Sequence, residues 1–420
     1  MTRHLVLITN TFPFGRGEEF IEAEAPIVAR HFDQVHVIAT QVPDDATQTR
    51  VLPPNARPHS VRTPQQGLRG RLTFLAAGLP RALRHRTSRA RSGEGSPHPS
   101  RVASALFFEA RAQFISSRVL PIIDAIPLRA GDEVVVYSFW LHLTARVGEL
   151  VVDSIRARQA GVRVRFVSRA HGYDLYHEAS TLGFLPQRHA LLSALDAVYP
   201  VSQAGADHLT AHYPEYAGKV RVQRLGSRDP DPLPLVSRDR LYITSCAFVV
   251  PIKRLDRFPP IMERLAERGV PVTWTHIGGG PGLAELQAQA AQVNTLAEVR
   301  FVGHLDHRQL FDHYARTPST VFLSLSAREG LPVSMMEAIS GAIPLVATRV
   351  GGVPEIVRAG VSGVLVPAEF TDDEVVDALL SVWRMGDEEY AALSASARRL
   401  WEQEFRASTT YERFASLLTS

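Results

Sequence analysis

Cysteine and lysine are the residues that this chain has least of. Its 420 residues include a single cysteine, Cys246, which excludes an internal disulfide and makes a cytoplasmic location the simplest expectation. Lys219 and Lys253 are the only lysines, so nearly all positive charge comes from arginine. The net charge of +3 is too small to predict a nucleic-acid partner, and no nucleic-acid motif occurs.

Long apolar runs are missing as well. No apolar stretch approaches the roughly 18 residues that a membrane span requires. The run from His4 to Ile8 is too short for a secretory signal and predicts a first strand. With 45% hydrophobic and 21% charged residues, the composition is that of a soluble globular protein. A chain of 420 residues is too long for one core, so we expect two domains.

Short apolar runs alternate with helical patterns in both halves of the chain. Further strands are expected at 35–39, 134–137, 164–167, 197–201, 220–225, 242–248, 272–277, 300–302, 321–325, 345–347 and 364–366. This alternation predicts an α/β fold with parallel sheets. Residues 41–101, rich in proline and arginine, carry no clear assignment. Residues 226–240 combine proline, glycine and alternating charges, which indicates an interdomain linker.

The stretch from Ser326 to Glu355 contains two strand-to-helix turns. The first turn carries Glu329 and Gly330, and its helix, which bears Glu337, is expected to end with Gly341 in a left-handed conformation. Such turns present free backbone N–H groups and the positive end of a helix dipole, which suit a phosphate.

Two more features follow predicted strands of the second half. Pro251 is expected to open a helix to about Arg268, which places Lys253 and Arg254 at its cationic start. A triple-glycine turn centred on Gly279 follows the strand at 272–277. A charge-assisted hydrogen bond to a phosphate is worth roughly 1.5 to 3 kcal/mol.

Carboxylates repel phosphates, so Glu329 and Glu337 must serve another part of the same ligand. A carboxylate accepts hydrogen bonds from two hydroxyls at once, which makes sugar hydroxyls the obvious candidates. A ligand that has both a diphosphate and hydroxyl-rich parts is a nucleotide sugar.

The first half offers two candidate ligand contacts. Gly15 and Gly17 follow the first strand and either let the backbone approach a ligand or serve as turn residues alone. The dinucleotide fingerprint needs a third glycine where Phe20 stands, which disfavours a dehydrogenase. His171 follows the strand at 164–167 and can hold or relay a proton, with Asp174 orienting it; a turn histidine without a role is the alternative.

No metal site is expected. Asp229 and Asp231 match a carboxylate pair that holds a divalent metal in one class of sugar transferases, but in a linker we interpret the match as incidental. His208 and His212 have metal-ligand spacing on a helix without a third ligand in view, which favours a surface position.

Residues 62–91 form a strongly basic segment interleaved with leucines. Between Arg62 and Arg101 there are nine arginines and one acidic residue, Glu94. The segment is either a basic amphipathic stretch on an anionic membrane or an exposed basic helix and a solvated loop.

The run from Arg328 to Ala338, continued by Pro344 to Glu355, resembles the signature of retaining glycosyltransferase family 4. The stretches 12–18 and 169–174 are similar to members that build bacterial surface polysaccharides on lipid carriers. The resemblance implies the GT-B fold, in which two Rossmann-like domains face each other across a cleft and the last helix crosses back to the first domain. We therefore expect an acceptor domain at 1–225 plus about 401–420, a linker at 226–240 and a donor domain at 241–400.

The resemblance also implies roles for residues of the donor domain. Glu329 would contact the transferred sugar and Glu337 the ribose hydroxyls. Lys253 would hold the diphosphate, supported by the amides of Gly330 and Leu331.

In the acceptor domain, the resemblance implies that His171 lies near the reacting carbon and that Gly15 or Gly17 approaches the phosphate across the cleft. Many members place an arginine where this chain has Phe248. Arg254 is expected to supply the missing charge.

The expected activity is that of a retaining, metal-independent hexosyltransferase without a cofactor. It would move a sugar from a nucleoside-diphosphate sugar to a saccharide or lipid-linked saccharide in bacterial glycan biosynthesis, in the cytoplasm or on the inner face of the membrane. A nucleotide-sugar-binding protein without transfer activity, or a transferase for a soluble small-molecule acceptor, are the alternatives.

Overall fold

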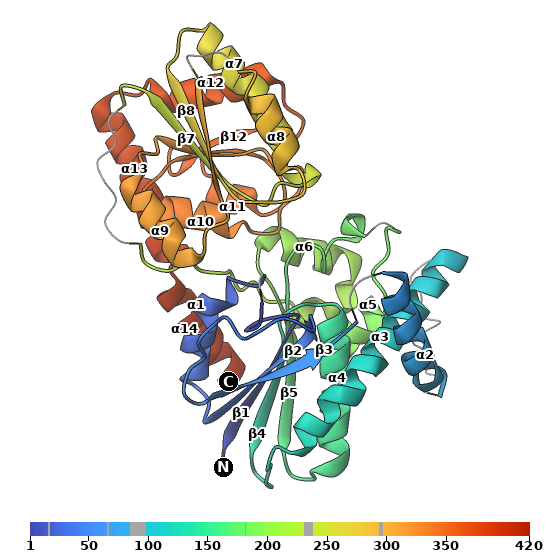
Figure 1. The fold of residues 1–420 in the computed structure, drawn as a ribbon. Helices are drawn as coiled ribbons and strands as arrows, with labels where there is room; N and C mark the ends of the chain where they lie inside the picture. The colour runs from blue at the N-terminus through green and yellow to red at the C-terminus, as the bar shows by residue number, and fades with distance from the viewer. Residues whose placement is uncertain (16, 65–66, 85–97, 181, 231–237, 294–296) are drawn as a thin grey trace. The chain divides into compact units, whose positions relative to one another are not determined.

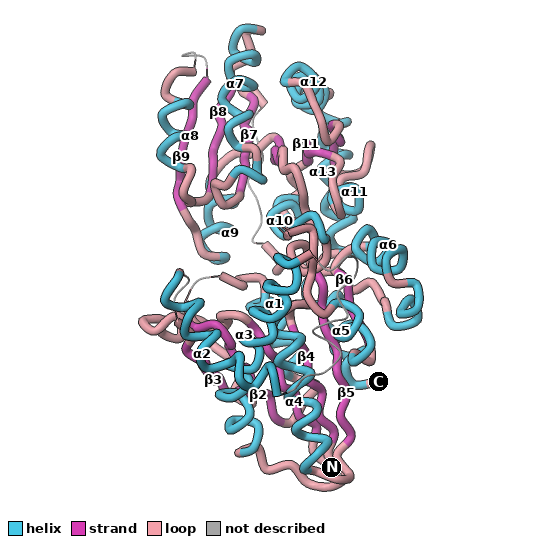
Figure 2. Tube along the Cα trace, turned by 90° about the vertical axis from the view of Figure 1, so that its right-hand side faces the viewer, coloured by secondary structure: helices cyan, strands magenta, loops and turns pink. Residues whose placement is uncertain are grey.

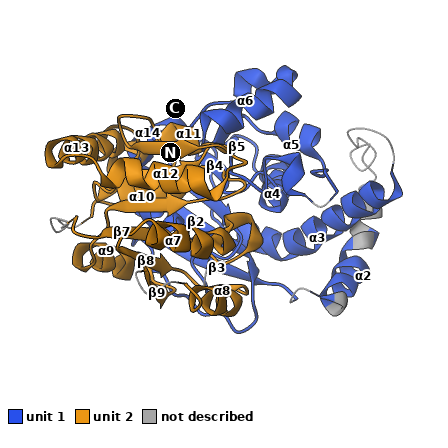
Figure 3. Ribbon diagram, turned by 90° about the horizontal axis from the view of Figure 1, so that it is seen from above, with its two compact units in different colours: residues 1–223, 411–420 blue, residues 224–410 orange. Residues whose placement is uncertain are grey.

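The structure is a computed structural model of the chain. It describes residues 1–420 apart from 16, 65–66, 85–97, 181, 231–237 and 294–296. Tertiary contacts divide the chain into two compact units, residues 1–223 with 411–420 and residues 224–410 (Figure 3). Each unit is built on its own parallel sheet.

The first unit has a six-stranded sheet in the order β3-β2-β1-β4-β5-β6 (Figure 1). Its strands are β1 (Arg3–Thr9), β2 (Gln34–Val42), β3 (Ala56–Arg62), β4 (Glu133–Ser138), β5 (Arg163–Ala170) and β6 (Ala197–Pro200). Successive side chains of a strand point to opposite faces, and both faces are covered here. Val6 and Ile8 of β1 therefore join one core, whereas Leu5 and Leu7 join the other.

Helices cover both faces of this sheet. They are α1 (Ile21–Ala29), α2 (Leu68–Arg84), α3 (Pro99–Asp124), α4 (Leu143–Arg158), α5 (Arg188–Ala194), α6 (Gln203–His212) and α14 (Ala407–Thr419), with short 3-10 turns η2 (His177–Ala179) and η3 (Pro214–Lys219). In Figure 1, α1 and α14 lie on one side of the strands and α3 and α4 on the other.

The end of α14 is part of the first unit because its aromatic side chains pack against the strands of that unit. The buried ring of Phe414 lies 5.3 Å from the rings of both Tyr137 and Tyr199. The guanidinium of Arg169 lies 4.1 Å from the centre of the same ring and pairs with Glu24 at 2.9 Å. The chain thus returns to the first unit after traversing the second.

The second unit repeats the architecture with the order β12-β11-β10-β7-β8-β9. Its strands are β7 (Leu241–Cys246), β8 (Val272–Ile277), β9 (Ala297–Gly303), β10 (Val321–Ser324), β11 (Leu345–Thr348) and β12 (Gly363–Val366). Its helices are α7 (Phe258–Glu267), α8 (Leu283–Ala290), α9 (His307–Arg316), α10 (Val333–Ser340), α11 (Val353–Ile356), α12 (Asp372–Trp383) and α13 (Asp387–Glu404), with 3-10 turns η4 (Pro251–Lys253) and η5 (Leu255–Arg257). Figure 2 shows helices packed around the strands of each unit.

Both sheets reverse their strand order at one point, between β1 and β4 in the first unit and between β7 and β10 in the second. Connections leave in opposite directions on the two sides of such a point. The carboxyl ends of the flanking strands therefore border a crevice, which is where open α/β sheets bind ligands.

The predicted α/β fold with two parallel sheets is confirmed, but several local predictions are wrong. The helix predicted from Pro251 is interrupted because Arg254 has a φ of 48°, so α7 begins at Phe258. The predicted strand at 220–225 contributes one isolated bridge, and Ala342 (φ 58°), not Gly341, takes the left-handed position after α10.

Inside 41–101 the structure contains β3, which was not predicted, and α2, which lies in the basic segment where a helix was one of the two interpretations. Of the seven residues of β3, Val61 alone is buried. An edge strand with so little burial has no apolar run to mark it in the sequence.

Candidate functional site

The loops that follow β7 and β10 meet at the carboxyl edge of the second sheet, beside the point where its strand order reverses. The amide of Ala327 donates to the carbonyl of Ile252 at 2.8 Å and joins the two loops. Lys253 extends its Nζ to within 2.6 Å of Oε1 of Glu329. Both side chains are partly buried, at 26% and 11% exposed. The structure therefore brings the predicted cation and one predicted glutamate together.

The conformation after β7 separates Lys253 from Arg254. Lys253 ends the 3-10 turn η4, and the left-handed backbone of Arg254 turns the chain. The Arg254 guanidinium donates to the carbonyl of Ala368 at 2.7 Å and pairs with Glu369 at 3.0 Å. Phe248, which stands where the family resemblance expects an arginine, is 59% exposed. Lys253 thus faces Glu329, whereas Arg254 is directed toward the segment after β12.

The turn that carries Glu329 packs backbone to backbone against the Gly351-Gly352 turn. A Cβ atom on Gly351, whose φ is 48°, would lie 1.9 Å from the carbonyl oxygen of Glu329. The amide of Gly352 donates to the carbonyl of Gly330 at 2.9 Å. Glycine is needed at position 351 both for its φ and for this close approach.

The triple-glycine turn lies against the segment that follows β7. Gly278 and Gly280 have φ values of 144° and 143°. The amide of Val249 donates to the carbonyl of Gly279 at 2.7 Å, and a Cβ on Gly280 would lie 2.7 Å from the Val249 nitrogen. This contact holds Gly279 beside the chain that leads to Lys253.

Glu337 lies on α10 and is 3% exposed. Its charge acts on Cys246, the last residue of β7: burial raises the pKa of the Cys246 thiol to about 12, with a further rise from Glu337 and an opposing effect from Lys253. Glu337 and Lys253 therefore both lie close to the end of β7. Gly330 and Leu331 immediately precede Pro332, the residue before α10, so their backbone lies at the N-terminal end of that helix.

Arg349 is a further cation that sequence reasoning did not single out. It directly follows β11, its amide donates to the carbonyl of Val366 at 2.9 Å, and it is exposed. Arg349 follows a predicted strand and so belongs to the same sheet edge as Lys253. That position in the sequence could have identified it.

In the first unit, His171 and Asp174 lie together after β5. The amide of His171 donates to Oδ1 of Asp174 at 2.8 Å, and its Nδ1 lies 3.6 Å from Oδ2. Burial alone would raise the pKa of Asp174, but its hydrogen bonds to His171 and to the amide of Leu141 hold that pKa below its usual value. The His171 ring packs 4.8 Å from the ring of Phe139 and 4.4 Å from that of Trp140. Asp174 therefore binds the backbone amide of His171 and places a carboxylate beside the His171 ring.

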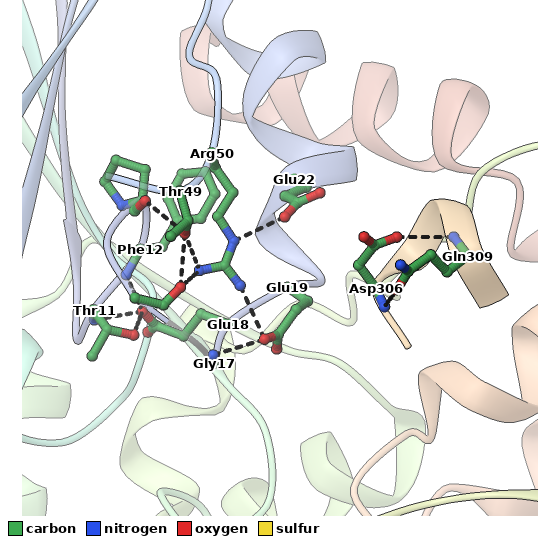
Figure 4. A network of polar contacts seen from close by, with 12 residues as sticks. Thr11, Phe12, Gly17, Glu18, Glu19, Glu22, Thr49, Arg50, Asp306 and Gln309 are labelled. Carbon is green, nitrogen blue, oxygen red and sulfur yellow. Dashed lines mark hydrogen bonds and ion pairs between the residues drawn. The ribbon is translucent and has the colours of Figure 1, made fainter. Parts of the chain in front are cut away.

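Gly15 and Gly17 lie in the loop after β1, and their amides bond within the first unit. Figure 4 shows Gly17 beside Glu19 and Arg50. The amide of Gly15 donates to the carbonyl of Thr47 at 3.0 Å, and that of Gly17 to Oε1 of Glu19 at 2.7 Å. Glu19 in turn pairs with Arg50 at 2.9 Å. A phosphate that approached these two amides would have to displace both acceptors.

Glu18 is the residue of this loop that sequence reasoning missed. Its carboxylate accepts the amides of Thr11 and Phe12, each at 2.7 Å, and the indole N–H of Trp140 at 2.5 Å. It therefore fixes the loop after β1 to the aromatic ring that packs on His171. An acid just before a helix is an ordinary helix-start signal, so nothing in the sequence marks this role.

The remaining candidates are placed as follows. Asp229 pairs with Arg406 at 2.7 Å, and Asp231 lies outside the described residues. Within the basic segment 62–91, residues 65–66 and 85–91 also lie outside them. Phe74 of α2 is 6% exposed, with its ring 5.0 Å from that of Phe114, so it faces the core. No helix in the described part of the chain is long and apolar enough to span a bilayer.

Comparison with known proteins connects this geometry to sugar transfer. The family model of glycosyl transferases group 1 matches residues 234–400. The chain is 32% identical over 308 residues to D-inositol 3-phosphate glycosyltransferase 1 of Catenulispora acidiphila, covering 63% of this chain and 68% of that protein. It is 27% identical over 289 residues to WcaL of Escherichia coli, a protein named for colanic acid biosynthesis, covering 65% and 69%.

The amylovoran biosynthesis glycosyltransferase AmsK of Erwinia amylovora is 28% identical, and the match spans about half of each chain, 48% and 51%. Among solved structures, HepE of Anabaena, in complex with UDP and glucose, is similar with a TM-score of 0.66 at 15% identity over the full length of both chains. Sucrose-phosphate synthase of Thermosynechococcus elongatus gives a TM-score of 0.70 at 14% identity, covering 99% and 98%. At these identities the likeness shows the fold, which is the two-domain α/β fold of GT-B proteins.

Replacing Gly351 tests the close approach of the two turns. Gly351→Ala must move the carbonyl of Glu329, whereas Gly360→Ala adds a Cβ into open space at a similar positive φ of 71°. We expect the control to lose about 1 to 2 kcal/mol of unfolding free energy from backbone strain alone, and Gly351→Ala to lose clearly more in urea denaturation. Equal losses would contradict the packing described.

Proposed function

Since the chain belongs to the glycosyl transferases of group 1, we propose that it moves a sugar from a nucleoside-diphosphate sugar to an acceptor hydroxyl with retention of anomeric configuration, as in glycosyltransferase family 4. The observation that carries the proposal is the contact of 2.6 Å between Lys253 and Glu329 at the carboxyl edge of the second sheet. A phosphate-binding cation and a hydroxyl-binding carboxylate lie side by side there.

Lys253 supplies positive charge for the diphosphate in this proposal. Before donor binding, Glu329 balances that charge. In the complex the diphosphate shares Lys253 with Glu329, whose carboxylate also accepts hydroxyls of the transferred sugar. The amides of Gly330 and Leu331, at the start of α10, support the diphosphate. Arg254 contributes charge at longer range, because its guanidinium bonds to Ala368 and Glu369.

Glu337, buried on α10, takes the ribose hydroxyls, and Gly279 borders the nucleotide. Glu337 is only 3% exposed, so only part of its carboxylate can reach a ligand. Such a fixed acceptor suits two adjacent hydroxyls on a rigid ring better than a flexible part of the ligand. The first unit supplies the acceptor side, with His171 near the reacting carbon and Asp174 orienting it. Gly15 and Gly17 would approach a ligand through their backbone only where it displaces Thr47 and Glu19 from their amides.

In the reaction, the bond between the anomeric carbon and the phosphate oxygen breaks while the bond to the acceptor oxygen forms. The negative charge that develops on the leaving diphosphate falls next to Lys253, which is already held in place by Glu329 and needs little reorganisation. The leaving phosphate oxygen takes the acceptor proton, so no separate general base is required. We propose that Lys253 and the helix amides provide the stabilisation and that no catalytic metal is needed.

The acceptor that we propose is a saccharide or a lipid-linked saccharide of a bacterial glycan, used in the cytoplasm. The names of AmsK and WcaL support this class of acceptor. A membrane-apposed acceptor would also give the basic segment 62–91 a role on the anionic inner face of the membrane. Phe74 is buried and Leu72 is 57% exposed, so we expect the exposed arginines to provide most of that contact.

Release of nucleoside diphosphate from a panel of nucleotide sugars tests transfer. We expect slow hydrolysis of at least one donor by the wild type, and a fall of about 100-fold or more in Lys253→Ala because one preorganised charge is lost. Arg316→Ala removes an exposed arginine of α9 and should leave the rate unchanged. Thermal stabilisation by donors without any release, even with saccharide acceptors present, would instead identify a nucleotide-sugar-binding protein.

Flotation with liposomes tests the membrane contact. We expect the protein to float with anionic but not with neutral vesicles, and salt to release it because the contact is between charges. Arg71→Glu should weaken flotation, whereas Arg316→Glu should not; both arginines are exposed. Absence of flotation argues for a soluble acceptor, and flotation that is insensitive to salt and to Arg71 would contradict an electrostatic contact through this segment.

A further inference from the structure

Three histidines of the first unit converge on one place outside the proposed donor site. His177 lies in η2, and His208 and His212 lie one turn apart on α6. One ring nitrogen of each lies within 4.8 Å of those of the other two. The loop after β5 carries η2 and the loop after the neighbouring strand β6 leads into α6. The fold therefore supplies the third histidine that the sequence spacing of His208 and His212 does not reveal.

The dimensions of this histidine cluster are those of a metal site after small side-chain rotations. A zinc ion bound at about 2.0 to 2.1 Å from each nitrogen holds the nitrogens of a tetrahedral site roughly 3.4 Å apart. The ring centres of His208 and His212 are 4.1 Å apart. The ring centre of His177 lies 5.8 Å from that of His208 and 5.5 Å from that of His212.

The hydrogen bonds of the cluster suit metal binding. Nδ1 of His212 donates to the carbonyl of His208 at 2.9 Å, which leaves the lone pair on Nε2. A backbone carbonyl commonly fixes the tautomer of a metal-bound histidine in this way. Nε2 of His208 is buried and has no hydrogen-bond partner among the described residues. Nε2 of His177 lies 2.9 Å from the hydroxyl of Tyr213, which orients that ring.

The side-chain chemistry of the cluster indicates which metals it would take. Imidazole is the ligand that zinc, copper and nickel accept in proteins, whereas calcium and magnesium prefer oxygen.

We propose that His177, His208 and His212 bind one divalent transition-metal ion of the zinc class, with water completing the coordination. The ion would join η2 to α6. It would thereby restrain residues 171–179, the segment that contains His171 and Asp174. The role is structural, and it involves none of the residues proposed to bind the sugar donor. Its test is therefore independent of sugar transfer.

Zinc binding to the full-length protein, prepared without a histidine tag and stripped with a chelator, tests the site. Equilibrium dialysis against Zn²⁺, with bound metal measured by mass spectrometry, should give one ion per chain at micromolar or tighter affinity. His212→Ala and His177→Ala should each weaken binding at least tenfold. His189→Ala removes a half-exposed histidine of the same unit that lies outside the cluster and should bind as the wild type does.

Cobalt provides a second readout, because visible absorption bands of a low-symmetry Co²⁺ site should appear in the wild type and in His189→Ala but not in His212→Ala. His212 is exposed, so its variant should keep the wild-type circular dichroism; were it to unfold, His212→Gln, which preserves more of the side-chain volume, would be measured in its place. Absence of stoichiometric zinc in the wild type, or equal affinity after substitution of His177 and His212, would overturn the proposal.

Discussion

The close approach of two backbone turns is the constraint on which the proposed donor site depends. Gly351 leaves room for the carbonyl of Glu329, since any Cβ there would lie 1.9 Å from that oxygen. The approach fixes the turn between β10 and α10, and that turn directs the Glu329 carboxylate to Lys253. A charge held in this way does not need to reorganise when a diphosphate leaves, which is where preorganised sites gain most of their effect.

The two units present different chemistry at the corresponding edges of their sheets. In the second unit the edge carries Lys253 and exposed Arg349. In the first unit the carboxylates of Glu18 and Glu19 accept hydrogen bonds from backbone amides of the loop after β1. Aromatic rings pack against His171. Carboxylates that already occupy amide donors make a poor phosphate site. This contrast supports the assignment of the donor diphosphate to the second unit and of the acceptor to the first.

Features that depend on local sequence could be predicted, whereas features that depend on tertiary contacts could not. Apolar runs and glycine turns are local, so they indicated both sheets and placed Lys253 and Glu329 at one edge. The direction of the Arg254 side chain depends on a single left-handed residue, and the contacts of Glu18 reach across to Trp140. Neither has a local signal. The same holds for His177, which joins His208 and His212 only because β5 and β6 are neighbours.

Affinity measured by calorimetry for a nucleoside and for its diphosphate tests most directly whether Lys253 binds the phosphates. The base is chosen as the one whose diphosphate binds the wild type most tightly. If Lys253 makes a charge-assisted hydrogen bond worth roughly 1.5 to 3 kcal/mol, Lys253→Ala weakens the diphosphate about 10- to 150-fold and leaves the nucleoside unchanged. Equal weakening of both ligands, or of neither, would contradict the account.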